Sequence, residues 1–252
     1  AESLNSTNNT QPALVAVEVA TWRALNGKIS ADVMAGHSLG EYSALVCAGA
    51  LRFEDALMLV RRRGELMQKA VPDGVGAMAA ILGMADEKVE EICKLCEQGQ
   101  VVQAANYNSP GQLVIAGNKE AVERAVVACK EGGAKRAMLL PVSGPFHSAL
   151  MLPAADEFAE YLTQFDVSDP ILPVLQNASN TFETEAQQIR QNLVKQIASP
   201  VRWTQSVELL ADKGAENLLE IGPGKVLTGL NKRIAKQLNS QAVNCVDALN
   251  QL

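Results

Sequence analysis

The pattern of apolar and polar positions divides the 252-residue chain into segments with helical spacing and short continuous apolar runs. Apolar residues that recur every three or four positions predict a helix, and a short apolar run between turn residues predicts a strand. Apolar runs predict strands over residues 32–35 and 217–221, and a proline-bounded segment covers residues 169–174. Helices are predicted over residues 12–25, 41–48, 53–70, 149–164, 184–197, 203–213 and from about residue 226. Helices and strands mixed in this way are typical of an α/β fold.

A different order of elements begins after the break Pro-Asp-Gly at residues 72–74. This β-α-β-β-α-β order is the ferredoxin-like arrangement. Its middle strands are joined across the turn-rich tetrapeptide Asn-Ser-Pro-Gly at residues 108–111. We therefore expect a larger α/β domain made of residues 1–73 and 143–252, with residues 74–142 inserted in it as a small subdomain. The predicted elements of the insertion are strand 77–82, helix 86–97, strands 101–105 and 113–116, helix 119–131 and strand 137–142.

The composition excludes several classes of protein. A net charge of −6 and an isoelectric point near 5.1 argue against a protein that binds nucleic acid non-specifically. No apolar run reaches membrane-spanning length and the N-terminus lacks the profile of a signal peptide, so we expect a cytoplasmic protein without a membrane partner. The five scattered cysteines favour the same reducing compartment. Cys93 and Cys96 form a C-x-x-C pair, but no second pair or nearby histidine completes a metal site, so we expect no metal.

Candidate chemistry comes from the two histidines of the chain, because each lies next to a serine. His37 falls in Gly-His-Ser-Leu-Gly at residues 36–40, which matches the G-x-S-x-G nucleophile elbow between a strand and a helix. Because side chains alternate along a strand, His37 should point away from the hydroxyl of Ser38. His147 is then the histidine left to act as the base that activates Ser38. The alternative is that residues 36–40 form only a glycine-rich structural turn.

One predicted helix carries an arginine on its apolar face. Positions 56, 60, 63 and 67 share a face of helix 53–70, and they hold Ala56, Val60, Arg63 and Met67. A buried guanidinium without an anion is costly, so Arg63 needs a negative partner. That partner is either an internal Asp or Glu or a carboxylate that the substrate brings. The sequence leaves both alternatives open.

Further motifs extend this picture along the chain. They are GHSLGE at residues 36–41, Arg63 twenty-five residues after Ser38, NYNSPGQ at 106–112, PFHS at 145–148, Gln196 before Pro200 and Val201, and GPGKVL at 222–227. Together they resemble the malonyl-CoA:acyl carrier protein transacylases, an acyltransferase family of fatty acid and polyketide synthesis, over nearly the whole chain and in the same order. The resemblance implies a hydrolase-like parallel-sheet core with an inserted ferredoxin-like subdomain, in agreement with the predicted elements.

The resemblance also implies a role for each site residue. Ser38 forms the malonyl ester, and His147 acts first as base and then as acid. The backbone carbonyl of Gln196 orients His147 in place of the aspartate of an ordinary triad, and no Asp or Glu of the sequence stands out as a triad partner. Arg63 holds the free carboxylate of the malonyl group. The other implied substrate contacts are the backbone N–H of Leu39, which stabilises the oxyanion, Phe146, which crowds the carbon between the two carbonyls, and Asn108.

The implied activity is transfer of a malonyl group from malonyl-CoA to the phosphopantetheine thiol of acyl carrier protein, by a ping-pong mechanism through the serine ester. We expect these two partners, no cofactor and a monomer. Family members begin with a strand and a loop that supplies a second oxyanion donor, and this chain opens without a methionine, so we expect that first strand to be missing from the segment 1–73. A serine hydrolase or thioesterase that uses the same Ser38–His147 pair, and a non-catalytic carrier-docking module, are the competing hypotheses.

Carrier recognition should depend on local basic residues, because a protein of net charge −6 would repel an acidic carrier. The best clusters in the sequence are Lys135 with Arg136, and Lys232, Arg233 and Lys236 near the C-terminus.

Overall fold

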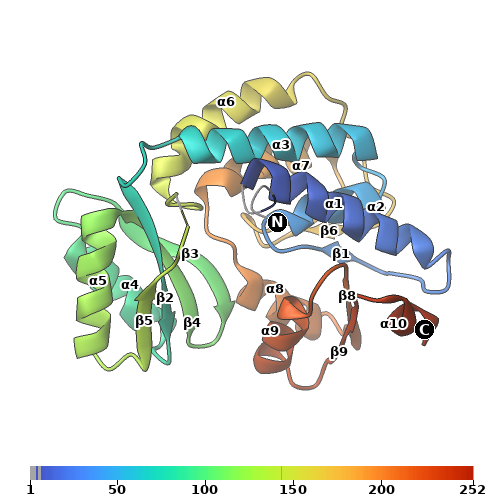
Figure 1. The fold of residues 1–252 in the computed structure, drawn as a ribbon. Helices are drawn as coiled ribbons and strands as arrows, with labels where there is room; N and C mark the ends of the chain where they lie inside the picture. Colours follow the sequence, from blue (N-terminus) through green and yellow to red (C-terminus); the bar gives the residue numbers. More distant parts are fainter. Residues whose placement is uncertain (1–3, 5–6, 143, 252) are drawn as a thin grey trace.

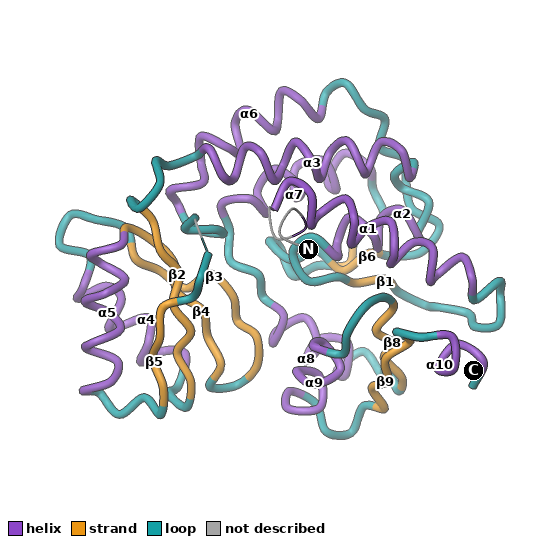
Figure 2. The backbone as a smooth tube through the Cα atoms, viewed as in Figure 1, coloured by secondary structure: helices purple, strands orange, loops and turns teal. Residues whose placement is uncertain are grey.

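The computed structural model describes residues 4, 7–142 and 144–251. Figures 1 and 2 show a helix-rich large part, a small sheet with two helices on one side, and a C-terminal part that ends in a short helix. Ser143 lies at the predicted boundary between two domain segments and is outside the described residues.

The large part contains a short sheet with helices packed around it. β1 (Met34–Ala35) pairs in parallel with β6 (Val174–Leu175), and β6 pairs antiparallel with β7 (Phe182–Glu183). Because β1 and β6 run parallel, the residues that follow the two strands lie at the same edge of the sheet. The helices of this part are α1 (Thr7–Ala24), α2 (Gly40–Cys47), α3 (Phe53–Lys69), α6 (Leu152–Leu162) and α7 (Ala186–Ala198), with a 3-10 turn at Ala149–Met151 before α6.

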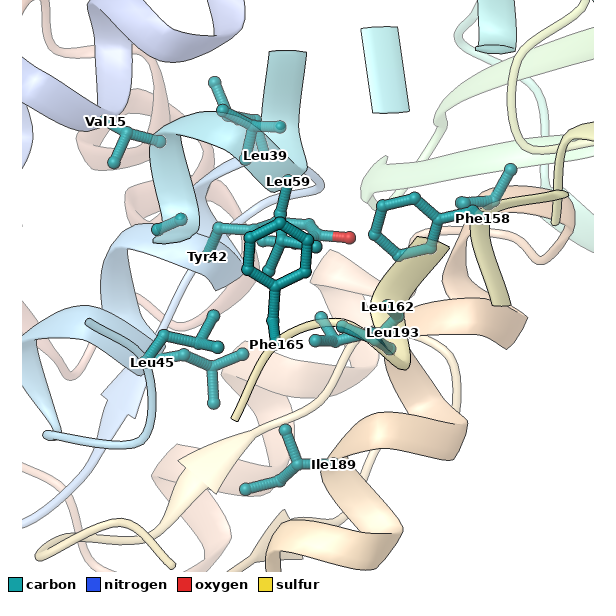
Figure 3. Close-up of a cluster of buried hydrophobic side chains, with 14 of the residues drawn as sticks. Val15, Leu39, Tyr42, Leu45, Leu59, Phe158, Leu162, Phe165, Ile189 and Leu193 are labelled. Atoms are coloured by element: carbon teal, nitrogen blue, oxygen red, sulfur yellow. The ribbon is translucent and has the colours of Figure 1, made fainter. Parts of the chain in front are cut away.

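The main hydrophobic core joins these helices. Tyr42 and Leu45 of α2, Leu59 of α3 and Phe158 of α6 are fully buried, and Figure 3 shows their side chains converging with others of the cluster. Full burial of one large apolar side chain contributes roughly 1.5–3 kcal/mol, so several such contacts fix the helices relative to one another. The start of α2 and the core-facing side of α3 are therefore fixed relative to each other by the same hydrophobic core.

The small sheet is antiparallel and has its own core. Its strands lie in the order β3-β4-β2-β5, and α4 and α5 pack over one face of it (Figure 1). Met78, Ala105, Val114 and Ala116 form a second apolar cluster, against which Phe146 packs. In chain order the elements are β2 (Gly76–Leu82), α4 (Asp86–Cys96), β3 (Val102–Ser109), β4 (Gln112–Asn118), α5 (Lys119–Glu131) and β5 (Arg136–Leu139).

The C-terminal part forms a parallel strand pair with its own apolar cluster. β8 pairs with β9 in register from Asn217 with Asn239 to Ile221 with Val243. β8 and β9 form a sheet separate from that of β1, and residues of β1 and β8 both line a cavity of about 1080 Å³. The elements are α8 (Trp203–Asp212), β8 (Asn217–Ile221), α9 (Val226–Ile234), β9 (Asn239–Val243) and α10 (Val246–Asn250).

The predicted element types are confirmed for most of the chain, whereas several boundaries were wrong. The first helix begins at Thr7, five residues earlier than expected, and Pro12 lies inside it beyond the first turn, where a proline removes one N–H of the helical ladder. β3 and β4 extend nearer to the turn that joins them than predicted, since β3 continues to Ser109 and β4 begins at Gln112. Asn108 therefore belongs to β3. The helix expected from about residue 226 ends at Ile234, and β9 and α10 follow it. β9 was missed because its polar residues, Asn-Ser-Gln-Ala-Val, give no apolar run.

Candidate active site

Ser38 lies in the tight turn between β1 and α2. Its backbone is left-handed, with φ of +51°, a conformation that non-glycine residues adopt rarely and mostly at functional sites. Gly36 makes this turn possible, because a Cβ on it would lie 2.0 Å from the carbonyl carbon of Gly40, whereas a Cβ on Gly40 would meet no other atom within 4 Å. The first glycine of G-x-S-x-G is therefore required by the close approach of two backbone segments, and the turn presents the hydroxyl of Ser38 beside the start of α2.

The hydroxyl of Ser38 forms a hydrogen bond with His147. Ser38 Oγ lies 2.8 Å from His147 Nε2, and His147 Nδ1 lies 2.9 Å from the backbone carbonyl oxygen of Gln196 in α7. A carbonyl oxygen can only accept, so Nδ1 carries the proton and Nε2 is the free acceptor for the serine proton. Like Ser38, His147 has a left-handed backbone, with φ of +59°. The pair predicted from the sequence is brought together in the geometry of a nucleophile and its base.

Burial keeps His147 neutral. The side chain is buried, and loss of solvation lowers the pKa of His147 to about 3, with the positive charge of Arg63 as the second cause. The hydrogen bond to the Gln196 carbonyl acts in the opposite direction but is the weaker effect. A neutral imidazole is the form that accepts a proton, so the base is ready for use throughout the physiological pH range.

The side chain of Arg63 extends from α3 to the hydroxyl of Ser38, and the residue is 1% exposed. Nη2 donates to Ser38 Oγ at 2.9 Å and to the side-chain oxygen of Gln196 at 2.9 Å, and Nη1 donates to the side-chain oxygen of Gln11 at 2.7 Å. The guanidinium also lies 5.5 Å from the ring centre of Tyr42. All these partners are neutral, and within the described part of the chain Arg63 forms no ion pair. The internal Asp or Glu partner that the sequence left open is therefore absent from these residues.

The acid that most affects this cation is Glu41, one residue into α2. Glu41 is fully buried, its Oε2 accepts the backbone N–H of Asn177 at 2.7 Å, and its Oε1 accepts no hydrogen bond from any described residue. Burial raises the pKa of Glu41 to about 7, although the Asn177 N–H, the Gln196 amide and the charge of Arg63 all favour the ionised form. Glu41 thus supplies at most a partial and indirect counter-charge for Arg63.

His37 points away from the Ser38–His147 pair, as predicted. Its Nε2 lies 2.9 Å from Oδ1 of Asn108 in β3, and its ring centre lies 5.9 Å from that of Trp203. Burial lowers the pKa of His37, so this imidazole is also held in the neutral form. The contact joins the elbow to the small sheet and places Asn108 beside the site.

The remaining predicted residues also adjoin the pair. The backbone N–H of Leu39 donates to no atom of the described residues, so a donor at the start of α2 is left free. Phe146 packs between the main core and the second apolar cluster of the small sheet, directly before His147 in the chain. Free donors near a serine are what a developing oxyanion requires.

Two polar residues of the site were missed at the sequence level. Gln11 shares the buried face of α1 with Val15 and Val19, so the signal that identified Arg63, a polar residue on an apolar stripe, was present there too. Asn177 follows a two-residue strand, and no periodicity marks it. Both contacts come from segments distant in sequence from Ser38.

Comparison with known proteins identifies the family. The acyl transferase domain family matches residues 1–249. The chain belongs to this family. The malonyl CoA-acyl carrier protein transacylase of Haemophilus influenzae is 54% identical to this acyl transferase over 253 residues, which cover 99% of the chain and 81% of the relative. The family resemblance inferred from the motifs is thereby confirmed.

Solved structures agree with this assignment. The acyl carrier protein S-malonyltransferase of Vibrio cholerae, 54% identical, matches with a TM-score of 0.98 over 99% of this chain and 82% of its own. A malonyl-transacylase solved in complex with a type II PKS acyl-carrier protein, 53% identical, matches with a TM-score of 0.97 over the same shares of the two chains. The mixed α/β fold of this acyl transferase is therefore the fold of these enzymes.

Two further observations concern membrane-spanning helices and metal sites, which the sequence analysis also considered. Within residues 4, 7–142 and 144–251, no helix has both the length and the apolar character needed to cross a membrane. In the same residues, no group of three or more His, Cys, Asp and Glu side chains is arranged to hold a metal ion.

Proposed function

We propose that this acyl transferase moves a malonyl group from malonyl-CoA to the phosphopantetheine thiol of acyl carrier protein, through an ester on Ser38. The proposal is supported by the names of relatives that match almost the whole chain at 54–55% identity, and by the neighbouring structure of a malonyl-transacylase bound to an acyl-carrier protein. It is also supported by the hydrogen-bonded Ser38–His147 pair and the unpaired cation beside it.

In the first half-reaction, Ser38 Oγ attacks the thioester carbonyl of malonyl-CoA while Nε2 of His147 takes the serine proton. The carbonyl oxygen becomes negative in the tetrahedral intermediate, and the free N–H of Leu39 is the donor that we assign to it. When the C–S bond breaks, His147 returns the proton to the thiolate of coenzyme A. The enzyme is left with a malonyl ester on Ser38 and a neutral His147.

The second half-reaction runs the same steps with a different thiol. His147 takes the proton of the carrier's phosphopantetheine thiol, the sulfur attacks the ester carbonyl, and Ser38 leaves with the proton that His147 gives back. Throughout, the carbonyl of Gln196 holds Nδ1 protonated, as the Asp of an ordinary triad would.

Selectivity for malonyl rests on Arg63, and this is the observation that carries the proposal. The guanidinium is buried, has only neutral partners and contacts the atom that becomes acylated. A malonyl group on Ser38 brings a carboxylate into reach of the fork of donors, which pairs best with a planar anion. An acyl group without that carboxylate leaves the cation unpaired.

The finer features of the site follow the same proposal. We assign to Phe146 the crowding of the carbon between the two carbonyls, and to Asn108, held by His37, a contact with the substrate. The large domain comprises residues 1–73 and 143–252, with a hydrolase-like core, and residues 74–142 form the ferredoxin-like insertion. The strand order β3-β4-β2-β5 and the separate core of the insertion support this division. The reaction as written needs no cofactor, and we propose a monomeric cytoplasmic enzyme.

The hydrolase hypothesis is not favoured. In serine hydrolases of the lipase and esterase kind the histidine follows an acidic triad member late in the chain, whereas here 105 residues follow His147 and its partner is a backbone carbonyl. The relatives named above are transacylases.

The test is to incubate the protein with malonyl-CoA and to locate the adduct by intact mass and peptide mapping. The expected result is a malonyl ester on Ser38 that passes to the thiol of holo acyl carrier protein faster than it is lost to water. An ester that hydrolyses at the same rate with and without the carrier would indicate a thioesterase. No adduct at all would leave only the docking-module hypothesis.

A further inference from the structure

Asn177 is a buried residue that contacts the elbow from the opposite strand. It follows β6, which runs parallel to β1, so the two chain segments that leave the sheet there lie side by side. The side chain is 2% exposed and belongs to none of the groups that react. Its position brings an amide group against the backbone of the residues that include Ser38.

The amide of Asn177 makes a two-point contact with this backbone. Its Oδ1 accepts the backbone N–H of Ser38 at 2.6 Å, and its Nδ2 donates to the carbonyl oxygen of Gly36 at 2.7 Å. The N–H of Ser38 has no other partner among the described residues. A primary amide has one acceptor and one donor side, so it satisfies the two backbone groups that flank His37 as a neighbouring strand would.

Asn177 is itself held in place by α2. Its backbone N–H donates to Oε2 of Glu41, and Glu41 lies three residues after Ser38 on the same elbow. The contacts therefore close a ring from Gly36 through Asn177 to Glu41. The left-handed backbone of Ser38 lies inside this ring, where an unsupported turn would relax to a more common conformation.

We propose that Asn177 is a positioning residue, which fixes the elbow so that the Ser38 hydroxyl faces His147 and the Leu39 N–H faces the oxyanion. The inference rests on the proposed acyl transfer but concerns the nucleophile alone. Asn177 contacts neither the acyl group nor coenzyme A in this role. Its loss should therefore reduce the rate of serine acylation and leave substrate binding nearly unchanged, since small misplacements of a reacting atom have large effects on rate.

The first experiment compares Asn177→Ala with Asn231→Ala, another buried asparagine whose amide forms two side-chain hydrogen bonds, to Trp203 and Ser240. Single-turnover acylation by malonyl-CoA is measured by intact mass, and Ser38 labelling by a fluorophosphonate is measured in parallel. The expected result for Asn177→Ala is a loss of about tenfold to hundredfold in both rates with little change in KM, while Asn231→Ala keeps both rates despite a similar drop in Tm.

The second experiment uses Asn177→Asp. A protonated Asp accepts and donates as the amide does, whereas an ionised Asp places a second acceptor against the Gly36 carbonyl. Burial and the neighbouring Glu41 carboxyl favour the protonated form, and the positive charge of Arg63, which also acts on Glu41, opposes it. The acylation rate relative to wild type should therefore fall as the pH rises from about 6 to about 9.

The outcomes separate this inference from the proposed function. Fluorophosphonate labelling without malonylation in the wild type would overturn the malonyl transfer and leave the role of Asn177 testable by the label. Wild-type rates in folded Asn177→Ala, losses matched by Asn231→Ala, or a pH-independent ratio for Asn177→Asp would each overturn the positioning role.

Discussion

The guanidinium of Arg63 donates a hydrogen bond to the hydroxyl of Ser38 at 2.9 Å. The two residues lie 25 positions apart, on α3 and on the turn before α2, and both helices pack on the main core. A buried cation therefore touches the hydroxyl that we propose to be acylated, with no acid paired to it among the described residues. This relationship makes the acyl group the natural source of the missing negative charge.

Replacing Arg63 should change acyl specificity. Arg63→Ala should lose most malonyl transfer and gain relative activity on acetyl-CoA, because breaking a buried charge pair costs about 2–5 kcal/mol. The measurement is the ratio of kcat/KM for malonyl-CoA over acetyl-CoA in the folded variant. Arg61→Ala is the control, since Arg61 lies on the exposed face of the same helix. A ratio that stays at the wild-type value in Arg63→Ala would show that Arg63 does not read the substrate.

Ser38 and His147 should act as one unit. Ser38→Ala and His147→Ala should each lower transfer by several powers of ten, and the double variant should be little worse, because each change alone removes the attack. His37→Ala should show no such coupling, since its imidazole contacts Asn108. Losses that multiply in the Ser38–His147 double variant would contradict the mechanism.

The value of kcat/KM for malonyl-CoA should not fall near pH 6.5, as it would if the base were a histidine with an ordinary pKa. Burial, and secondly Arg63, lower the pKa of His147 to about 3, so the imidazole stays neutral as the pH falls through its ordinary value of 6.5. Because kcat/KM reports the free enzyme, its value for malonyl-CoA should stay level from about pH 7.5 to about pH 5.5. In Arg63→Ala the fall of kcat/KM at acid pH should move to higher pH, because the positive charge that lowers the pKa of His147 is gone. A wild-type fall centred near 6.5 would contradict this assignment.

Glu41 should make stability fall as the pH rises. Burial raises its pKa from 4.5 to about 7, so between these values the folded state holds a proton that the unfolded state has released. The stabilisation is complete below about pH 4.5 and is lost as the pH rises through about 7. Glu41→Gln keeps an acceptor for the Asn177 N–H but cannot ionise. Its free energy of unfolding relative to wild type should therefore increase over this range, by at most about 1.4 kcal/mol per pH unit.

Urea denaturation at several pH values measures this difference, and Glu123→Gln on the exposed face of α5 is the charge-matched control. A difference between Glu41→Gln and wild type that does not vary with pH would mean that Glu41 ionises as freely in the fold as in the unfolded chain.

Carrier recognition should depend on exposed basic residues on and just after α9. Lys232, Arg233 and Lys236 are exposed on and just after α9, and Arg233 Nη1 donates to Gln112 Oε1 at the start of β4. Lys232→Glu should raise KM for acyl carrier protein, more strongly at low salt, and leave acylation by malonyl-CoA unchanged. Lys94→Glu on α4 makes the same change in net charge at an exposed site away from α9. Equal effects of Lys232→Glu on both half-reactions would assign Lys232 to folding instead.

The sequence by itself predicted most of the elements and the residues that we propose to react. Helical spacing revealed α3 and placed Arg63 on its apolar face, because a charge on a buried stripe violates the periodic pattern. The glycine spacing around Ser38 predicted the elbow, since the turn allows no side chain at Gly36. With only two histidines in the chain, and His37 directed away by strand alternation, His147 followed as the base.

The tertiary structure decided what each of these groups touches. Whether Arg63 pairs with an internal acid depended on Glu41, which lies near it and yet hydrogen-bonds Asn177 instead. The contacts of Gln11 and Asn177 join segments that are far apart in the chain, and no local pattern encodes such contacts. β6 and β9 were not predicted because pairing with a neighbouring strand, and not their own composition, makes these segments extended. Periodicity reports which face of an element is buried, but only the packing of several elements determines the atoms that meet there.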